Sequence, residues 1–216
     1  TATVSGGQLV LDGSPTNSYV QLPAGIVSGL DELTVETWVS CGNPINTNAN
    51  IFAFGNTETL ANNNDNPASA TFGDGENYIN VQLNNFLGNA QANFGQGDPG
   101  NSGERDAVIT GAALRGQTNV QIVTVYHPLA GTEAIYTNGV LGATISMWNN
   151  LIDPVANEGP TFTNINTGVP GGSILAYTLG ADPVNWIGQS LYTGDPYPVT
   201  PIPPDPGFNG SIDEFR

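Results

Sequence analysis

The sequence contains nineteen acidic side chains, and a glycosidase would need two of them as an acid pair. A retaining glycosidase holds two carboxyl groups about 5–5.5 Å apart across the bond that it cleaves. Residues two positions apart on one face of a strand would supply that spacing. Glu32 and Glu36 share a face but lie four positions apart, with Thr34 between them. The adjacent Asp213 and Glu214 point to opposite faces of a strand. We therefore expect Glu36 to face the concave surface of a sheet, or to pair with an arginine or a hydroxyl.

Other catalytic groups are equally scarce. His127 is the only histidine and precedes Pro128, where the chain is biased to extended geometry and a structural role is expected. No GxSxG motif accompanies it, so a catalytic triad is not supported. Cys41 is the only cysteine, which excludes an intrachain disulfide and predicts a buried, inert thiol. The sequence therefore predicts a protein that is not an enzyme, with a glycan hydrolase or lyase as the least favoured function.

The charge of the chain excludes several classes of partner. The net charge is −16, the only basic side chains besides His127 are Arg105, Arg115 and Arg216, and there is no lysine. Nucleic acid and anionic membranes both require clustered positive charge, so neither is an expected partner. No apolar run reaches the length of a membrane span. Asn, Thr, Ser, Gly and Gln must solvate the surface instead, which favours a secreted or cell-surface protein whose signal peptide has already been removed.

The hydrophobic pattern has a period of two almost everywhere, which predicts strands. Residues 33–39 and 78–83 alternate cleanly, and residues 120–126 are apolar on both faces, as in a central strand covered on each side. Asn138 and Gly139 predict a type I′ hairpin turn after the strand that contains Tyr136. Short strands separated by turn signals predict an all-β fold of two sheets or a barrel.

Three long irregular stretches interrupt this rhythm, at residues 57–75, 148–172 and 196–207. The first is rich in asparagine, and the last two contain several prolines. No internal repeat and no domain boundary is visible. We therefore expect one domain over residues 1–216, with the three stretches as enlarged loops that are functional or mobile.

Several segments together resemble the laminin-G-like, or concanavalin A-like, jelly-roll domains of secreted bacterial proteins. The segments that carry the resemblance are residues 11–13 and 19–23, residues 29–39 with Glu-x-Trp, residues 51–55, residues 125–131, the Tyr-x-Asn-Gly of residues 136–139, residues 186–190 with 195–197, and residues 208–216. Their order along the chain implies an antiparallel jelly-roll β-sandwich. The sequence departs from the family pattern at residues 198–207, which are inserted between Asp-Pro-Tyr and Phe-Asn-Gly-Ser-Ile-Asp-Glu.

The resemblance implies a domain that binds carbohydrate or protein partners, often with a structural calcium ion. Asp12 and Asp213 are the calcium ligands that it implies, because the first and last strands of this fold are neighbours, and Asp195 is a third. Calcium takes six to eight oxygen ligands, which an Asp- and Asn-rich chain can offer. The alternative for Asp12 is an Asx turn, in which the carboxylate accepts a hydrogen bond from its own loop.

Aromatic side chains in loops are candidate platforms for a sugar ring, because sugars combine apolar faces with hydroxyl rims. Trp148, Tyr192 and Tyr197 lie in or beside loops and are the predicted ligand-binding residues. Trp38 and Trp186 lie within strand patterns and are expected in the core. Tyr126 and Tyr136 are expected there as well.

The sequence therefore predicts a non-catalytic extracellular binding module for carbohydrate recognition or adhesion. A second hypothesis comes from the missing lysines, because sheet proteins commonly protect exposed edges with charge. Under this hypothesis, the chain is a structural subunit of a surface assembly of like or unlike subunits. It would then bind protein partners through its loops and sheet edges.

Overall fold

The computed structural model describes residues 1–27, 30, 32–55, 78–95, 105–111, 114–127, 132–146, 184–192 and 203–216. Within these residues the chain forms β-strands and turns but no α-helix, and nothing has the length and apolar character of a membrane-spanning helix. The strands are β1 Thr3–Ser5, β2 Gln8–Asp12, β3 Val20–Leu22, β4 Leu33–Cys41, β5 Asn50–Gly55, β6 Tyr78–Gln82, β7 Ala90–Gly95, β8 Arg105–Ile109, β9 Val120–His127, β10 Thr132–Thr137, β11 Val140–Ser146, β12 Val184–Ile187 and β13 Asn209–Asp213.

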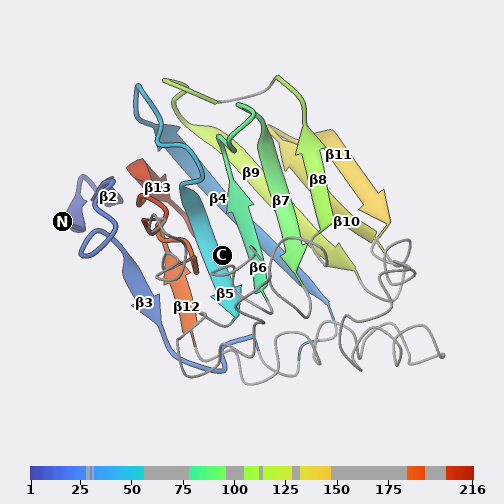
Figure 1. Cartoon of the computed structure of the whole chain (residues 1–216), viewed down its shortest axis with the longest axis horizontal. Helices are drawn as coiled ribbons and strands as arrows, with labels where there is room; N and C mark the ends of the chain where they lie inside the picture. Colours follow the sequence, from blue (N-terminus) through green and yellow to red (C-terminus); the bar gives the residue numbers. More distant parts are fainter. Residues whose placement is uncertain are drawn as a thin grey trace, which may run out of the picture.

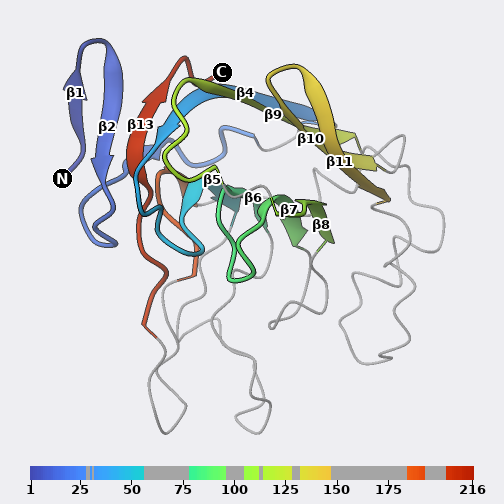
Figure 2. The same cartoon turned by 90° about the horizontal axis from the view of Figure 1, so that it is seen from above.

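The strands form two antiparallel sheets that pack face to face (Figure 1). Sheet A has seven strands in the order β1-β2-β13-β4-β9-β10-β11, and sheet B has six in the order β3-β12-β5-β6-β7-β8. Seen from above, sheet A curves over sheet B (Figure 2). The predicted all-β, two-sheet jelly roll is confirmed. The expected adjacency of the first and last strands is also present, because β13 pairs with β2 on one side and with β4 on the other.

Alternation along each strand determines which residues enter the space between the sheets. In β4 the buried residues include Val35, Thr37 and Val39, and in β9 every second residue from Val120 to Tyr126 is buried. The hairpin between β10 and β11 turns at Asn138 and Gly139, whose φ angles of 50° and 75° fit the predicted type I′ turn.

The core combines apolar packing with a polar connection between the sheets. The rings of Phe52 and Phe54 in β5 have centroids 4.9 Å apart, and they pack against the Phe215 ring with centroid distances of 5.8 and 6.2 Å. The fully buried Tyr126 projects from sheet A and donates a hydrogen bond from its hydroxyl to the Asn80 carbonyl of sheet B, at 3.1 Å. Tyr126 therefore lies in the core, as predicted.

The structure agrees with the prediction for Cys41 but not with the prediction that both faces of residues 120–126 are covered. Cys41 is buried, and burial raises the pKa of its thiol to about 12, which is the inert state predicted. β9 is a central strand, between β4 and β10. Its outward face, which carries Val123 and Val125, is only half-buried and is not covered as predicted.

The predicted loops at residues 57–75 and 148–172 lie outside the described residues, as does the part of the third loop up to residue 202. Residues 203–207 are described and contain no strand. The division of the chain into domains stays a prediction.

Candidate functional site

The strand register separates the two main calcium ligands implied by the family resemblance. Asp12 lies at the end of β2 opposite Asn209, whereas Asp213 lies at the far end of β13, one residue beyond the Ile212–Leu9 pair. Four positions along a strand correspond to about 13 Å. A single ion therefore does not bridge both carboxylates. Calcium binding at either residue stays a prediction, and Asp195 lies outside the described residues.

Asp12 makes the Asx turn that was the alternative to metal binding. Its Oδ1 accepts a hydrogen bond from the Ser14 N–H at 3.0 Å, and its own N–H donates to Ser18 Oγ at 2.8 Å. The Thr1 amino group contacts Oδ2. Hydrogen bonds from this amino group, then from the Ser14 N–H and Ser18, lower the pKa of Asp12 to about 2. In the part of the chain that is described, no three His, Cys, Asp or Glu side chains gather as metal ligands.

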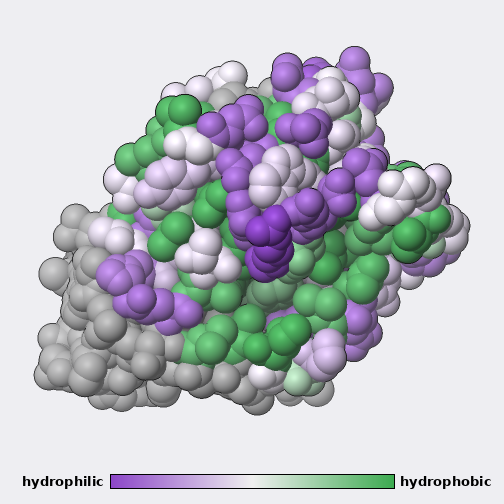
Figure 3. Space-filling model, turned by 180° about the vertical axis from the view of Figure 1, so that it is seen from behind, coloured by the Kyte–Doolittle hydropathy of each residue, from purple (hydrophilic) through white to green (hydrophobic). Residues whose placement is uncertain are grey.

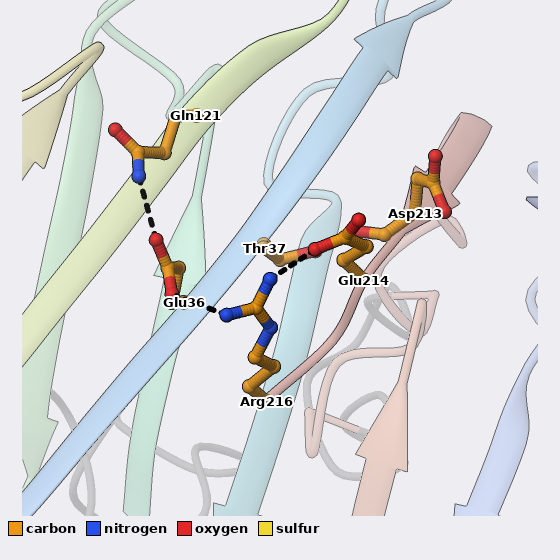
Figure 4. A network of polar contacts seen from close by, with 6 residues as sticks. All are labelled: Glu36, Thr37, Gln121, Asp213, Glu214 and Arg216. Carbon is orange, nitrogen blue, oxygen red and sulfur yellow. Dashed lines mark hydrogen bonds and ion pairs between the residues drawn. The ribbon is translucent and has the colours of Figure 1, made fainter.

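Glu36 belongs to a polar network on the outer face of sheet A (Figure 4). Gln121 Nε2 donates to Glu36 Oε1 at 2.6 Å, and Arg216 Nη1 lies 3.6 Å from Glu36 Oε2. Arg216 also pairs with Glu214, and this hydrogen bond is the main cause that raises the pKa of the guanidinium. The expected pairing of Glu36 with an arginine is thus present, and a cation lies between the two carboxylates.

The same arginine covers the aromatic ring on this face. The Arg216 guanidinium lies 5.6 Å from the ring centroid of Trp38, a cation–π distance. The space-filling view shows hydrophilic residues crossing the outer face of sheet A between more apolar areas (Figure 3).

His127 Nε2 forms a further surface pair with Glu32 Oε1, at 2.5 Å. The described acids on this face, Glu36, Glu214 and Glu32, therefore contact Arg216 or His127 rather than forming an acid pair.

The outward face of sheet B, away from sheet A, carries a different arrangement. The register aligns one residue from each strand in a row across the whole sheet. This row, here called the sheet B row, consists of Gln21, Trp186, Ala53, Asn80, Asn93 and Asp106. Aligned residues share one face, so an aromatic end and an amide-rich end lie on the same surface.

The amide end of the sheet B row is braced by its own hydrogen bonds. The Asn93 amide, with its nitrogen turned to β8, donates to Asp106 Oδ1 at 3.1 Å. In the next row, Gln91 Nε2 donates to Gln82 Oε1 at 3.2 Å. Asn80 and Asn93 are buried, 6% and 0% exposed. Hydrogen-bonded amides of this kind fix the side-chain orientations on this face of the sheet.

The aromatic end of the sheet B row is more open. The rings of Tyr19 and Trp186 lie 5.3 Å apart and are tilted by 50°. Both side chains are half-buried, and Gln21 beside them is exposed. The indole Nε1 of Trp186 has no hydrogen-bond partner among the described residues. Leu191 joins Trp186 in a small apolar cluster on this face, and the half-buried Tyr192 follows Leu191 directly.

The predictions for the aromatic residues have mixed outcomes. Tyr192 lies next to the cluster that holds Trp186, whereas Trp148 and Tyr197 are outside the described residues. The prediction that Trp38 and Trp186 are core residues is wrong, because both are half-buried on the outward faces of their sheets. Tyr136 is half-buried as well. Alternation contained the necessary signal, because Trp38 is out of phase with the buried Val35 and Val39.

Comparison with known proteins gives a consistent fold. No protein-family model matches the sequence, and no curated protein matches it. Domain 4 of AbnA, a GH43 extracellular arabinanase from Geobacillus stearothermophilus, solved in complex with arabinotriose, is similar with a TM-score of 0.59 and 19% identity over 100% of this chain and 74% of that chain. Mouse laminin α1 domains LG4–5 give a TM-score of 0.56 and 12% identity, over 99% of this chain and 42% of that one. The heptameric SAP-like pentraxin of Limulus polyphemus gives a TM-score of 0.51 and 13% identity, over 99% of this chain and 77% of that chain.

These similarities and the strand order define the class of the protein. The chain is a jelly-roll sandwich of the laminin-G-like, concanavalin A-like fold. At 12–19% identity the comparisons establish the fold alone.

Proposed function

We propose that this domain is a non-catalytic, extracellular module that binds a neutral carbohydrate at the aromatic end of the sheet B row. The observation that carries the proposal is the half-buried pair of Tyr19 and Trp186 beside the exposed Gln21. Such a pair offers apolar ring surface to a sugar face, and a planar amide offers both a donor and an acceptor to its hydroxyls. Farther along the same row, the buried Asn93 amide is held by its hydrogen bond to Asp106.

Charge and neighbouring chemistry support this ligand class. A net charge of −16 repels acidic sugars, so the preferred glycan is uncharged. The structurally similar arabinanase domain was solved with a neutral oligosaccharide, arabinotriose. The acids described around Glu36 are neutralised by Arg216, which supports binding without turnover.

Removal of the Trp186 ring provides the test. We expect Trp186→Ala to weaken binding of the preferred neutral oligosaccharide by more than about tenfold, since tryptophans at the centre of an interface carry much of its affinity. Trp38→Ala is the matched control, because Trp38 is also a half-buried strand tryptophan but lies on sheet A under Arg216. A glycan array followed by calorimetry measures both. Equal losses in the two variants, or unchanged binding in Trp186→Ala, would contradict the proposal.

A second candidate function, binding of a protein partner, is favoured by the turn between β6 and β7. Phe86 and Leu87 are 76% and 68% exposed there. The turn is held by Asn85, whose Oδ1 accepts from the N–H groups of Leu87 and Asn89, both at 2.9 Å. A rigid turn that presents two large apolar side chains suits insertion into a pocket of another subunit.

If a second copy supplies that pocket, the protein forms oligomers at micromolar concentration. Replacement of Phe86 and Leu87 by serine is then expected to shift it to monomer. Light scattering over a concentration series measures the change. A wild-type protein that is monomeric throughout the series would exclude self-association through this turn.

A further inference from the structure

We propose a second, independent site: Asn48, Asn50 and Asn84 bind a hard cation, Ca²⁺, at the end of sheet B where β5 begins and β6 ends. This site contains none of the three aspartates considered above. Its nearest residue, Asn50, pairs with Gln82, which lies two residues along β6 from Asn80 of the sheet B row, or about 7 Å. The ligands are amide oxygens rather than carboxylates.

The backbone places the three residues at neighbouring positions. Asn50 pairs with Gln82 at the start of β5, and the Asn48 N–H donates to the Asn84 carbonyl at 2.8 Å, which extends the ladder by one rung. Side chains opposite each other in such a ladder have Cβ atoms about 5 Å apart. The three asparagines therefore occupy two adjacent rungs.

Each of the three side chains has a buried oxygen with no partner. Oδ1 of Asn48, of Asn50 and of Asn84 is inaccessible and accepts no hydrogen bond from the described residues. Asn50 and Asn84 are 0% and 3% exposed as whole residues. A buried polar atom without a partner is costly and rare in native proteins, so three of them together indicate a missing donor or cation.

The orientation of these amides is fixed by the backbone. Asn50 Nδ2 donates to the Asn48 carbonyl at 3.2 Å, and Asn84 Nδ2 donates to the Ile45 carbonyl at 3.3 Å. Rotating either amide would place its oxygen against a carbonyl oxygen, which is repulsive. The oxygens of Asn50 and Asn84 therefore cannot exchange places with the nitrogens to find donors.

A cation satisfies this group of oxygens better than a single water molecule does. One water has two protons to donate, so it leaves one of three acceptors without a partner. Calcium accepts several oxygen ligands at once, including Asn side-chain carbonyls and waters. The net charge of −16 also concentrates cations around the protein. Because the three ligands are neutral, we expect weak affinity, with Kd of about 10⁻⁴–10⁻³ M as in other extracellular modules.

A change of ligand charge tests the site. Asn48→Asp is expected to tighten Ca²⁺ binding by about tenfold or more, because affinity rises with the charge of the ligand set. Asn48→Gly is expected to weaken it, since one ligand is lost while the φ of 60° stays comfortable. The bonds of Asn48 to Asn50 and Asn84 use its backbone groups, so both variants retain them.

Asn119→Asp is the matched control. Asn119 also has a positive φ, 53°, but it is exposed, so the variant adds the same charge away from the site. The full chain is first stripped with EDTA, and CaCl₂ or MgCl₂ is then titrated at constant NaCl, with calorimetry and the melting temperature as readouts. Ca²⁺ should raise the melting temperature by a few degrees in wild type and by more in Asn48→Asp. Asp12→Asn should respond as wild type does, which separates this site from the one predicted at Asp12.

Three outcomes would overturn the proposal. The first is wild-type protein that neither binds Ca²⁺ nor gains stability from it at millimolar concentration. The second is an Asn48→Asp variant with the same Ca²⁺ affinity as Asn119→Asp. The third is an Asn48→Asp variant that is destabilised equally with and without Ca²⁺, which would indicate bound water in place of the ion.

Discussion

Gly210→Ala is expected to cost about 3 kcal/mol or more of folding free energy and to lower the melting temperature by about 6–12 °C. An added Cβ would lie closer to the Ser40 carbonyl oxygen than real Cβ atoms come, and 2.9 Å from Phe208 Cζ. The φ of Gly210 is 153°, which a residue with a Cβ rarely adopts. β13 lies between β2 and β4, so it cannot shift without breaking a ladder on one side.

Urea denaturation followed by circular dichroism measures this loss. Gly139→Ala is the control that separates backbone strain from collision, because its φ is also positive, 75°, while its Cβ would meet nothing within 4 Å. We expect the control to lose only about 1 kcal/mol. Similar losses in the two variants would show that the contact with Ser40 is not the cause.

Tyr126→Ala is the second substitution with a large expected effect, about 3–5 kcal/mol, because it empties a fully buried aromatic position between the sheets. Tyr126→Phe keeps the ring and removes only the hydroxyl that donates to the Asn80 carbonyl, so we expect a loss of about 1 kcal/mol. Chemical denaturation of both variants measures the two parts. A Tyr126→Phe loss as large as that of Tyr126→Ala would mean that the hydrogen bond, not the packing, dominates.

The same residue makes stability sensitive to alkali. Burial, and then the negative charge of Glu133, raise the pKa of Tyr126 well above its ordinary value of 10.0. In the unfolded chain this phenol ionises near pH 10, whereas in the folded protein it stays neutral. Its contribution to stability is therefore complete below pH 10 and falls as the pH rises above it. Urea midpoints at pH 8 and pH 11 should differ less in Tyr126→Phe than in wild type, and an equal decline would contradict this assignment.

Local pattern predicts the strands well in this protein. The alternation in residues 33–39 and 120–126 places β4 and β9, and Asn138-Gly139 places the hairpin between β10 and β11. The physical reason is that strand periodicity and turn geometry depend on residues close together in sequence. The same alternation also indicated the outward direction of Trp38, although the size of its ring favoured a core position.

Register and long-range order are harder to obtain from the sequence. The adjacency of β2 and β13 was expected, but the sequence does not specify the offset that places Asp12 opposite Asn209 and far from Asp213. The sheet B row joins Gln21, Asp106 and Trp186, which local pattern cannot bring together. The orientation of the Asn84 amide is set by the hydrogen bond that its nitrogen donates to the Ile45 carbonyl, 39 residues away along the chain. Such features become visible only when the packed strands are known.

The central position of β13 in sheet A has a consequence for biosynthesis. β2 and β4 emerge from the ribosome long before β13. Until β13 inserts between them, the backbone N–H and C=O groups along one edge of each strand have no partner strand. Contacts so distant in sequence form slowly, and unfilled strand edges are prone to intermolecular pairing. Nascent chains halted before residue 209 should therefore depend on chaperones, and release of the last strand should coincide with the gain of protease resistance.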